Sequence, residues 1–179
     1  MEELDILIIA FAFYSLVGWC GEVLYNFLRE RRWVNRGLLS GPFFLLYGAG
    51  ALGPVLLSGP HSGFWQVIAI SAVWAAVVEY GGSVLLERVG LSYWNYADKP
   101  LNLHGRICFE SIAIFTAGLT ALVFVFHPGV MGMLSHLPAG LSALLAFAFV
   151  VYALIDGHRQ LQKQLAWHRQ TGRVRNLIQ

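Results

Sequence analysis

Apolar stretches of membrane length are the feature that most constrains this chain. About 20 residues of α-helix cross the hydrocarbon core of a bilayer. The 179-residue sequence contains five stretches close to this length: Ile6–Leu28, Leu38–Ser58, Phe64–Leu86, Phe109–Phe126 and Pro138–Ile155. Only 12% of the residues are charged, about half the share found in soluble domains. The sequence therefore predicts an all-α polytopic membrane protein with five transmembrane helices.

The distribution of basic residues predicts the orientation of these helices. All 12 Lys and Arg residues fall between the first and second stretches, between the third and fourth, or in the tail. With an odd number of crossings, these three segments lie on one side, and the excess of Lys and Arg marks that side as the cytoplasm. We therefore expect the N-terminus outside, the C-terminus in the cytoplasm, and a multi-pass protein of a bacterial plasma (inner) membrane.

The tail differs in character from the rest of the chain. We expect a five-helix transmembrane domain over residues 1–156 and a basic cytoplasmic tail over 157–179. Leu161 and Leu165 recur at helical spacing beside Trp167, with basic residues available to the other face. This pattern predicts an amphipathic helix lying on the inner leaflet. A solvated helix or a docking surface for a cytoplasmic partner are the alternatives.

The second apolar stretch is unusually rich in glycine and proline. It contains Pro42, Gly48, Gly50, Gly53 and Pro54. Small residues allow neighbouring helices to approach closely. Proline removes a backbone donor, and a broken helix lines the binding cavity in many transporters. Close helix packing and a broken helix are both compatible with the pattern.

Ionisable residues inside the apolar stretches indicate a functional site, because hydrocarbon tolerates them poorly. Glu22 and Glu79 lie in the cytoplasmic halves of the first and third stretches, and polar loop residues fall on the same membrane face. We expect one polar pocket facing the cytoplasm. The candidate substrate-binding residues are Glu22, Asn35, Arg36, Tyr47, Glu79, Glu87, Trp94, Tyr96, Asn102, His104 and Arg106.

Three chemistries fit such a pocket. The carboxylates could pair with Arg36 and Arg106 and hold helices together, or they could bind a cationic or proton-coupled substrate. The two arginines could instead hold a phosphate or carboxylate headgroup, since guanidinium groups match such anions. The spacing of Glu22, Glu79 and His104 matches no known metal motif, so we expect no metal and no cofactor.

Sequence motifs of soluble enzymes are missing from the chain. There is no G-x-x-x-x-G-K-[ST] phosphate loop, no H-E-x-x-H and no G-x-S-x-G. No catalytic residue can be named on this basis. The missing motifs favour a protein that is not an enzyme. If ATP hydrolysis drives the protein, a separate ATPase subunit must carry out the hydrolysis.

Several spaced blocks of residues resemble a known family. In the first half these are Gly18-Trp19 with Glu22, Asn35-Arg36-Gly37-Leu38-Leu39-x-Gly41-Pro42 and Tyr47-Gly48-x-Gly50. In the second half they are Leu86-Glu87, Trp94-x-Tyr96 and Asn102-x-x-Gly105-Arg106-Ile107-Cys108. Over about residues 18–110 the chain resembles the ABC-transporter permease family called CmpB. The resemblance implies a membrane permease but gives no information about its substrate or mechanism.

The chain departs from that family at two places. The family usually has Pro-Ile where this chain has Leu45-Leu46. It usually has Asp between the Trp and the Tyr, where Asn95 stands here. The loss of this acid argues against a proton carrier or a metal ligand at position 95.

The sequence leaves three functions open. The leading hypothesis is a small transporter or permease subunit, a homo-oligomer surrounded by membrane lipids, with its substrate site in the cytoplasmic half of the membrane. The first alternative is an intramembrane enzyme acting on a lipid or isoprenoid headgroup at the cytoplasmic leaflet. The second is a non-catalytic assembly or accessory protein. A role in binding nucleic acid is not expected.

Overall fold

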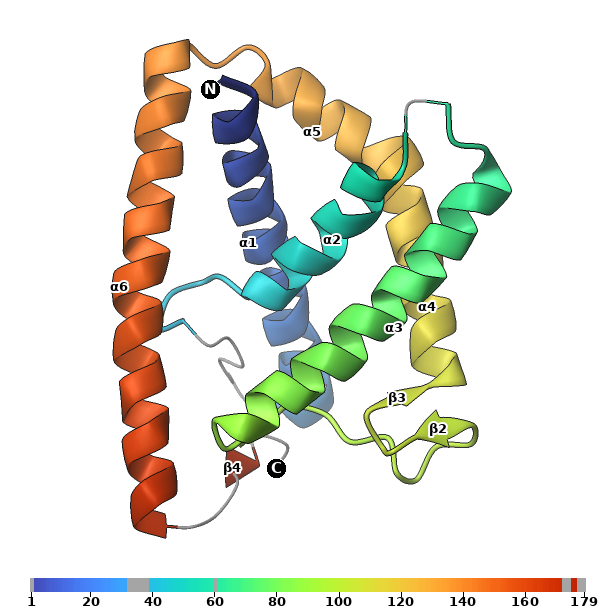
Figure 1. The fold of residues 1–179 in the computed structure, drawn as a ribbon, viewed down its shortest axis with the longest axis vertical. Helices are drawn as coiled ribbons and strands as arrows, with labels where there is room; N and C mark the ends of the chain where they lie inside the picture. Colours follow the sequence, from blue (N-terminus) through green and yellow to red (C-terminus); the bar gives the residue numbers. More distant parts are fainter. Residues whose placement is uncertain (1, 32–38, 60, 172–174, 177–179) are drawn as a thin grey trace. The chain divides into compact units, whose positions relative to one another are not determined.

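Helices dominate the computed structural model, which describes residues 2–31, 39–59, 61–171 and 175–176 (Figure 1). The helices are α1 (Glu2–Glu30), α2 (Leu45–Leu57), α3 (Phe64–Arg88), α4 (Phe109–Ala121), the π-helical turn η1 (Leu122–Phe126), α5 (His127–Leu134) and α6 (Ala139–Thr171). The strands are β1 (Leu91–Ser92), β2 (Asn102–Leu103), β3 (Ile107–Cys108) and β4 (Arg175–Asn176). The predicted all-α class is confirmed, with short strands only in the connections.

Four helical segments are long and apolar enough to cross a membrane. They are Glu3–Leu28, Phe64–Arg88, Phe109–Leu134 and Ala139–Trp167. Large apolar side chains on them face outward, among them Trp65 at 77% exposure and Phe147 at 68%. Such a surface suits contact with lipid. Four of the five predicted stretches thus form helices of membrane length.

The second predicted stretch, Leu38–Ser58, differs from the expectation. Its helix α2 has 13 residues and is about 20 Å long, shorter than the bilayer core of about 30 Å. Residues 39–44 precede it without helical structure. Pro42 cannot donate a backbone hydrogen bond and disfavours helical geometry at Gly41. A fifth helix of membrane length is therefore not found among the described residues.

Two other helices run further than predicted. The fourth stretch does not end at Phe126, because α5 follows η1 without a break as far as Leu134. The last helix likewise continues from Ala139 to Thr171 as one element. The predicted boundary at 156–157 thus falls inside α6, and no separate tail helix begins there. Contact of this extension with the inner leaflet remains a prediction.

The chain divides into two compact units. The first consists of Met1–Ala49 and His127–Gln162, and the second of Gly50–Phe126 and Lys163–Gln179.

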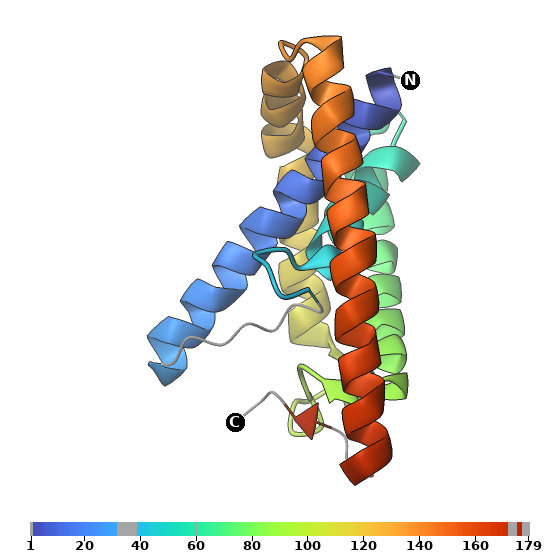
Figure 2. The same ribbon diagram turned by 90° about the vertical axis from the view of Figure 1, so that its left-hand side faces the viewer.

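In the first unit, α6 and α1 hold the non-helical segment 39–44 in place (Figures 1 and 2). Asp156 of α6 accepts hydrogen bonds from the amide and the hydroxyl of Ser40, both at 2.6 Å. The Tyr152 hydroxyl accepts one from the amide of Gly41 at 3.0 Å. The amide of Phe44 donates to the carbonyl of Ser15, in the middle of α1, at 3.0 Å. These two side chains and the Ser15 carbonyl satisfy backbone amides that a helix would have paired internally.

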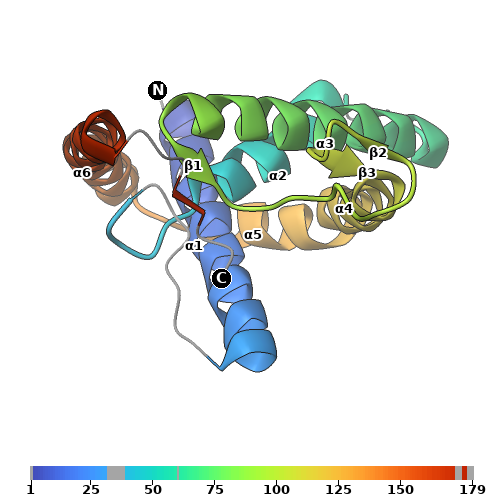
Figure 3. The same ribbon diagram turned by 90° about the horizontal axis from the view of Figure 1, so that it is seen from below.

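In the second unit, α3 packs along α4. The buried residues of α3 recur mainly at four-residue spacing and form one face: Val67, Ser71, Ala75, Glu79, Gly82 and Ser83. Residues 91–108 connect the two helices, and Figures 1 and 3 show this segment running from the end of α3 to the start of α4. We call residues 91–108 the cap. Within it, β2 pairs with β3 as an antiparallel hairpin.

The close approach of α2 to α1 gives a test of the fold. A Cβ atom added to Gly48 would meet the Ser15 hydroxyl and the Phe11 carbonyl oxygen, the latter at 2.8 Å. Backbone cannot move aside easily, so Gly48→Ala should lower the free energy of unfolding by about 1–3 kcal/mol. At Gly50 the nearest atom is a Val78 methyl at 4.0 Å. Gly50→Ala should therefore be neutral or stabilise by up to about 1 kcal/mol.

Thermal unfolding of both variants in the same detergent measures this difference. Equal stabilities of the two variants would contradict the packing of Gly48 against α1.

Candidate functional site

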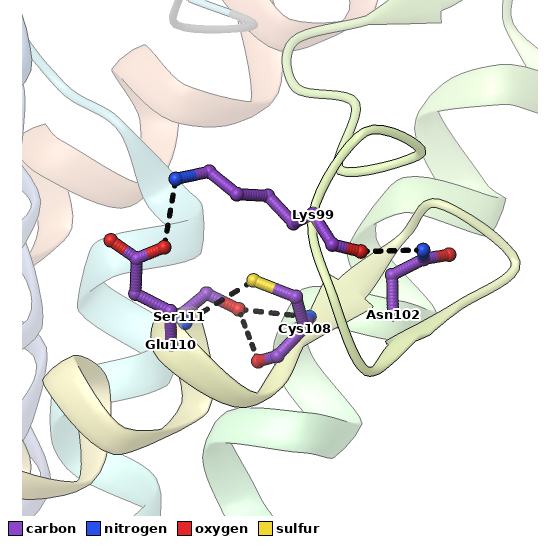
Figure 4. A network of polar contacts seen from close by, with 5 residues as sticks. All are labelled: Lys99, Asn102, Cys108, Glu110 and Ser111. Carbon is purple, nitrogen blue, oxygen red and sulfur yellow. Dashed lines mark hydrogen bonds and ion pairs between the residues drawn. The ribbon is translucent and has the colours of Figure 1, made fainter.

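The cap is folded by hydrogen bonds from its own side chains. The Asn102 amide group donates to the carbonyl of Lys99 at 2.8 Å (Figure 4), and its oxygen accepts from the amide of Gly105 at 3.0 Å. Gly105 has a φ of +68°, a backbone conformation that suits glycine. Asn102 thus shapes the hairpin turn through backbone contacts.

Hydrogen bonds join the start of the cap to its end. The Trp94 indole donates to the carbonyl of Arg106 at 2.9 Å, and the amide of Tyr96 donates to the carbonyl of Gly105 at 2.7 Å. Between them, the Asn95 side-chain oxygen accepts from the amide of Ala97 at 2.9 Å. This hydrogen bond forms a turn at position 95. An aspartate at this position would accept the same bond.

Glu79 lies where α3, the cap and α4 meet. Its side chain is buried, with 6% of the residue exposed. Oε1 accepts from the Tyr96 hydroxyl at 2.8 Å, and Oε2 lies 2.9 Å from the Ser111 hydroxyl of α4. Burial and the neighbouring Glu79 carboxyl raise the pKa of Tyr96 well above its ordinary value, so its phenol remains a hydrogen-bond donor. One carboxyl group therefore joins three segments through two neutral hydroxyls.

A second group of contacts holds the cap nearer the end of α3. Arg106 pairs with Glu87 at 2.5 Å, and its guanidinium lies 5.5 Å from the centre of the Tyr80 ring. The Tyr80 hydroxyl is 2.9 Å from Nδ1 of His104. The hydrogen bond to Glu87 raises the pKa of Arg106, which stays charged. At the far side of the cap, Lys99 pairs with Glu110 at 2.8 Å (Figure 4).

The first unit contains a separate carboxylate cluster around Glu22. The Tyr47 hydroxyl of α2 donates to Oε2 of Glu22 at 2.9 Å. The Asn26 amide donates to Oε1 of the same carboxylate at 3.1 Å and to the Glu22 carbonyl at 2.6 Å. Asn26 is fully buried. Gly18 makes room for Tyr47, because a Cβ atom there would overlap its ring.

The structure brings most of the predicted site residues into these two clusters. The cap and its contacts on α3 include seven of them: Glu79, Glu87, Trp94, Tyr96, Asn102, His104 and Arg106. Glu22 and Tyr47 form the cluster in the first unit. Asn35 and Arg36 lie outside the described residues. A single pocket shared by all of them remains a prediction.

Two further features bear on what the site can bind. Among the described residues, no three His, Cys, Asp or Glu side chains lie close enough together to hold a metal ion. An open apolar groove of about 690 Å³ lies between α3 and α4. Its lining includes Phe64, Phe109 and Thr116, and contains no ionisable side chain.

Sequence reasoning missed four residues. Ser111 and Tyr80 take part in the contacts around the cap, and Asp156 and Tyr152 hold residues 39–44. Ser111 could have been noticed from Cys108-x-x-Ser111, which forms a capping box at the start of α4. Tyr80 is next to Glu79 in the sequence but belongs to no recognisable motif. Asp156 lies at the end of an apolar stretch, where an acid is unusual, and Tyr152 lies one turn before it.

The turn at Asn95 can be tested directly. Asn95→Asp keeps the acceptor for the Ala97 amide and should leave thermal stability and protease resistance of the cap unchanged. Asn95→Leu removes it and should destabilise the cap by about 1 kcal/mol, with faster cleavage in limited proteolysis. Equal effects of the two substitutions would contradict a turn-forming role.

Comparison with known proteins identifies the family. A family model described as "Putative ABC-transporter type IV" matches residues 9–160. No curated protein and no solved structure matches the chain. The match covers most of the sequence and includes the blocks that resemble CmpB. The chain therefore belongs to this CmpB family of ABC-transporter type IV proteins.

Proposed function

We propose that this protein is a permease subunit that moves a solute across the plasma membrane and is controlled at its cytoplasmic side. The observation that carries the proposal is the buried Glu79, which ties the cap to α3 and α4 through Tyr96 and Ser111. A buried ionisable group inside a membrane helix is costly and is retained for function. A change in its charge or in its partners would release the cap.

The broken second segment supports the same proposal. Residues 39–44 bend and therefore span less than their extended length of about 20 Å, and α2 contributes about 20 Å. Together they can cross a core of about 30 Å, which gives five crossings with the N-terminus outside. This arrangement keeps all three basic segments in the cytoplasm. Irregular backbone within a membrane is a feature of transporter binding sites.

The candidate residues take the following roles in this proposal. Glu22 and Glu79 contact the substrate or a coupling ion. Arg36, Asn102 and Arg106 gate the site or bind an anionic part of the substrate. A homo-oligomer would complete the pathway, and a separate ATPase subunit would supply energy if ATP is used. The extension of α6 beyond Asp156 lies at the inner leaflet or docks such a partner.

The groove between α3 and α4 favours a second candidate function. Its volume of about 690 Å³ and its apolar lining suit a lipid or isoprenoid chain. An intramembrane enzyme would hold that chain there and act on the headgroup at the cytoplasmic leaflet. This reaction would need no sealed compartment, and the two candidates can therefore be separated.

Transport is tested with the purified protein in sealed liposomes. A mixture of small metabolites is supplied outside, and uptake is followed by mass spectrometry together with a pH dye inside. We expect uptake or proton flux that Glu79→Gln abolishes. The matched control, Glu110→Gln, changes an exposed acid at the start of α4 and should retain the flux.

Three outcomes would count against the transport proposal. Chemical change of a lipid extract in detergent, without flux, would support the enzyme. Co-purification with a partner and no activity would support an accessory role. Equal flux in the Glu79 and Glu110 variants would remove Glu79 from the pathway.

The number of crossings is tested by cysteine labelling. In a Cys20→Ser, Cys108→Ser background, Arg31→Cys and Ser62→Cys flank the second segment. If this segment crosses the membrane, a membrane-impermeant maleimide added to intact cells labels position 62 and leaves position 31 unlabelled until lysis. Labelling of both from the same side would show that the segment re-enters without crossing.

A further inference from the structure

We infer that Glu79 is a proton-binding site and that this structure holds it as the neutral carboxylic acid. The inference follows from the hydrogen bonds around the Ser111 hydroxyl, and it names a proton as the ion bound at the proposed site. Its role in coupling rests on the proposed transport function; the proton site itself does not.

Three polar contacts of the Ser111 hydroxyl bear on the state of Glu79. The amide of Cys108 donates to it at 3.2 Å. The carbonyl of Cys108 and Oε2 of Glu79 each lie 2.9 Å from it. Figure 4 shows the hydroxyl between the amide and the carbonyl of Cys108. A hydroxyl carries only one hydrogen, so it can donate to the carbonyl or to Oε2, but not fully to both.

A protonated Glu79 satisfies all these contacts at once. Its own O–H donates from Oε2 to the Ser111 oxygen, and Ser111 donates to the Cys108 carbonyl. The Ser111 oxygen accepts the second bond from the Cys108 amide, which is within its capacity of two lone pairs. Oε1, then the carbonyl oxygen of the acid, accepts from Tyr96. With an ionised Glu79, Oε2 and the Cys108 carbonyl compete for the single hydrogen of the Ser111 hydroxyl.

The surroundings of Glu79 favour the same state. Among the described residues, Glu79 has no ion-pair partner, and a buried carboxylate without one is costly. The titratable groups on the elements packed around it are occupied elsewhere. On α3, Glu87 pairs with Arg106, and Tyr80 with His104. On β3, the Cys108 sulfur accepts from the amide of Ser111, and on α4 Glu110 pairs with Lys99.

Loss of the proton would couple the negative charge on Glu79 to opening of the cap. The proton leaves Oε2 for water, and the Ser111 hydrogen turns from the Cys108 carbonyl towards the new carboxylate. The charge left behind is better solvated by water than by two hydroxyls. Opening of the cap at Tyr96 would admit that water. Proton release and cap opening are therefore expected to occur together.

Infrared difference spectroscopy tests the inference on the detergent-purified full-length protein, with proton concentration as the probe. At pH 7 an ordinary glutamic acid, with a pKa of about 4.3, is ionised. We expect a carboxylic-acid C=O band at pH 7 that disappears at alkaline pH. Glu79→Gln should remove this band, and Glu110→Gln should keep it. Tyr96→Phe should retain the band but shift it to higher frequency, because Oε1 loses its donor.

The outcomes separate this inference from the proposed function. A band at pH 7 that depends on Glu79 confirms the proton site even if liposomes show no transport. Transport without such a band at pH 7 overturns the inference and leaves the permease proposal standing. A band that persists in Glu79→Gln overturns the inference too. If Glu79→Gln does not fold, the Tyr96→Phe shift decides, and an unshifted band contradicts the assignment.

Discussion

The lack of water in the bilayer interior governs this structure. A polar group placed there must find its partner within the protein. Glu79 of α3 shows the consequence most clearly, because its partners come from two other segments: the cap supplies Tyr96, and α4 supplies Ser111. One buried acid thus ties the connection between α3 and α4 to both helices.

The same constraint explains the segment before α2. Its backbone amides would be unpaired in hydrocarbon, but Asp156, Tyr152 and the carbonyl of Ser15 accept from them. The non-helical conformation at Gly41 and Pro42 therefore depends on matching acceptors on α6 and α1.

The sequence predicted the features that depend on composition and missed those that depend on distant partners. Apolar length identified four helices. The acid at position 79 is buried between α3, the cap and α4, and its part in a substrate site remains a prediction. The break at residues 39–44 was foreseen only as one of two alternatives, because Gly and Pro also serve helix packing. Ser111 and Asp156 were missed because their importance comes from Glu79 and Ser40, which lie 32 and 116 positions away.

We conclude that Glu79 anchors the cap to α3 and α4. Hydrogen–deuterium exchange of the cap amides in detergent tests this most directly, with Glu79→Ala compared against Glu110→Ala. We expect faster exchange throughout residues 91–108 in the Glu79 variant and a much smaller effect in the control, because the exposed Lys99–Glu110 pair contributes little to stability. Unchanged exchange in the cap of Glu79→Ala would contradict it, since the cap would then be held without this acid.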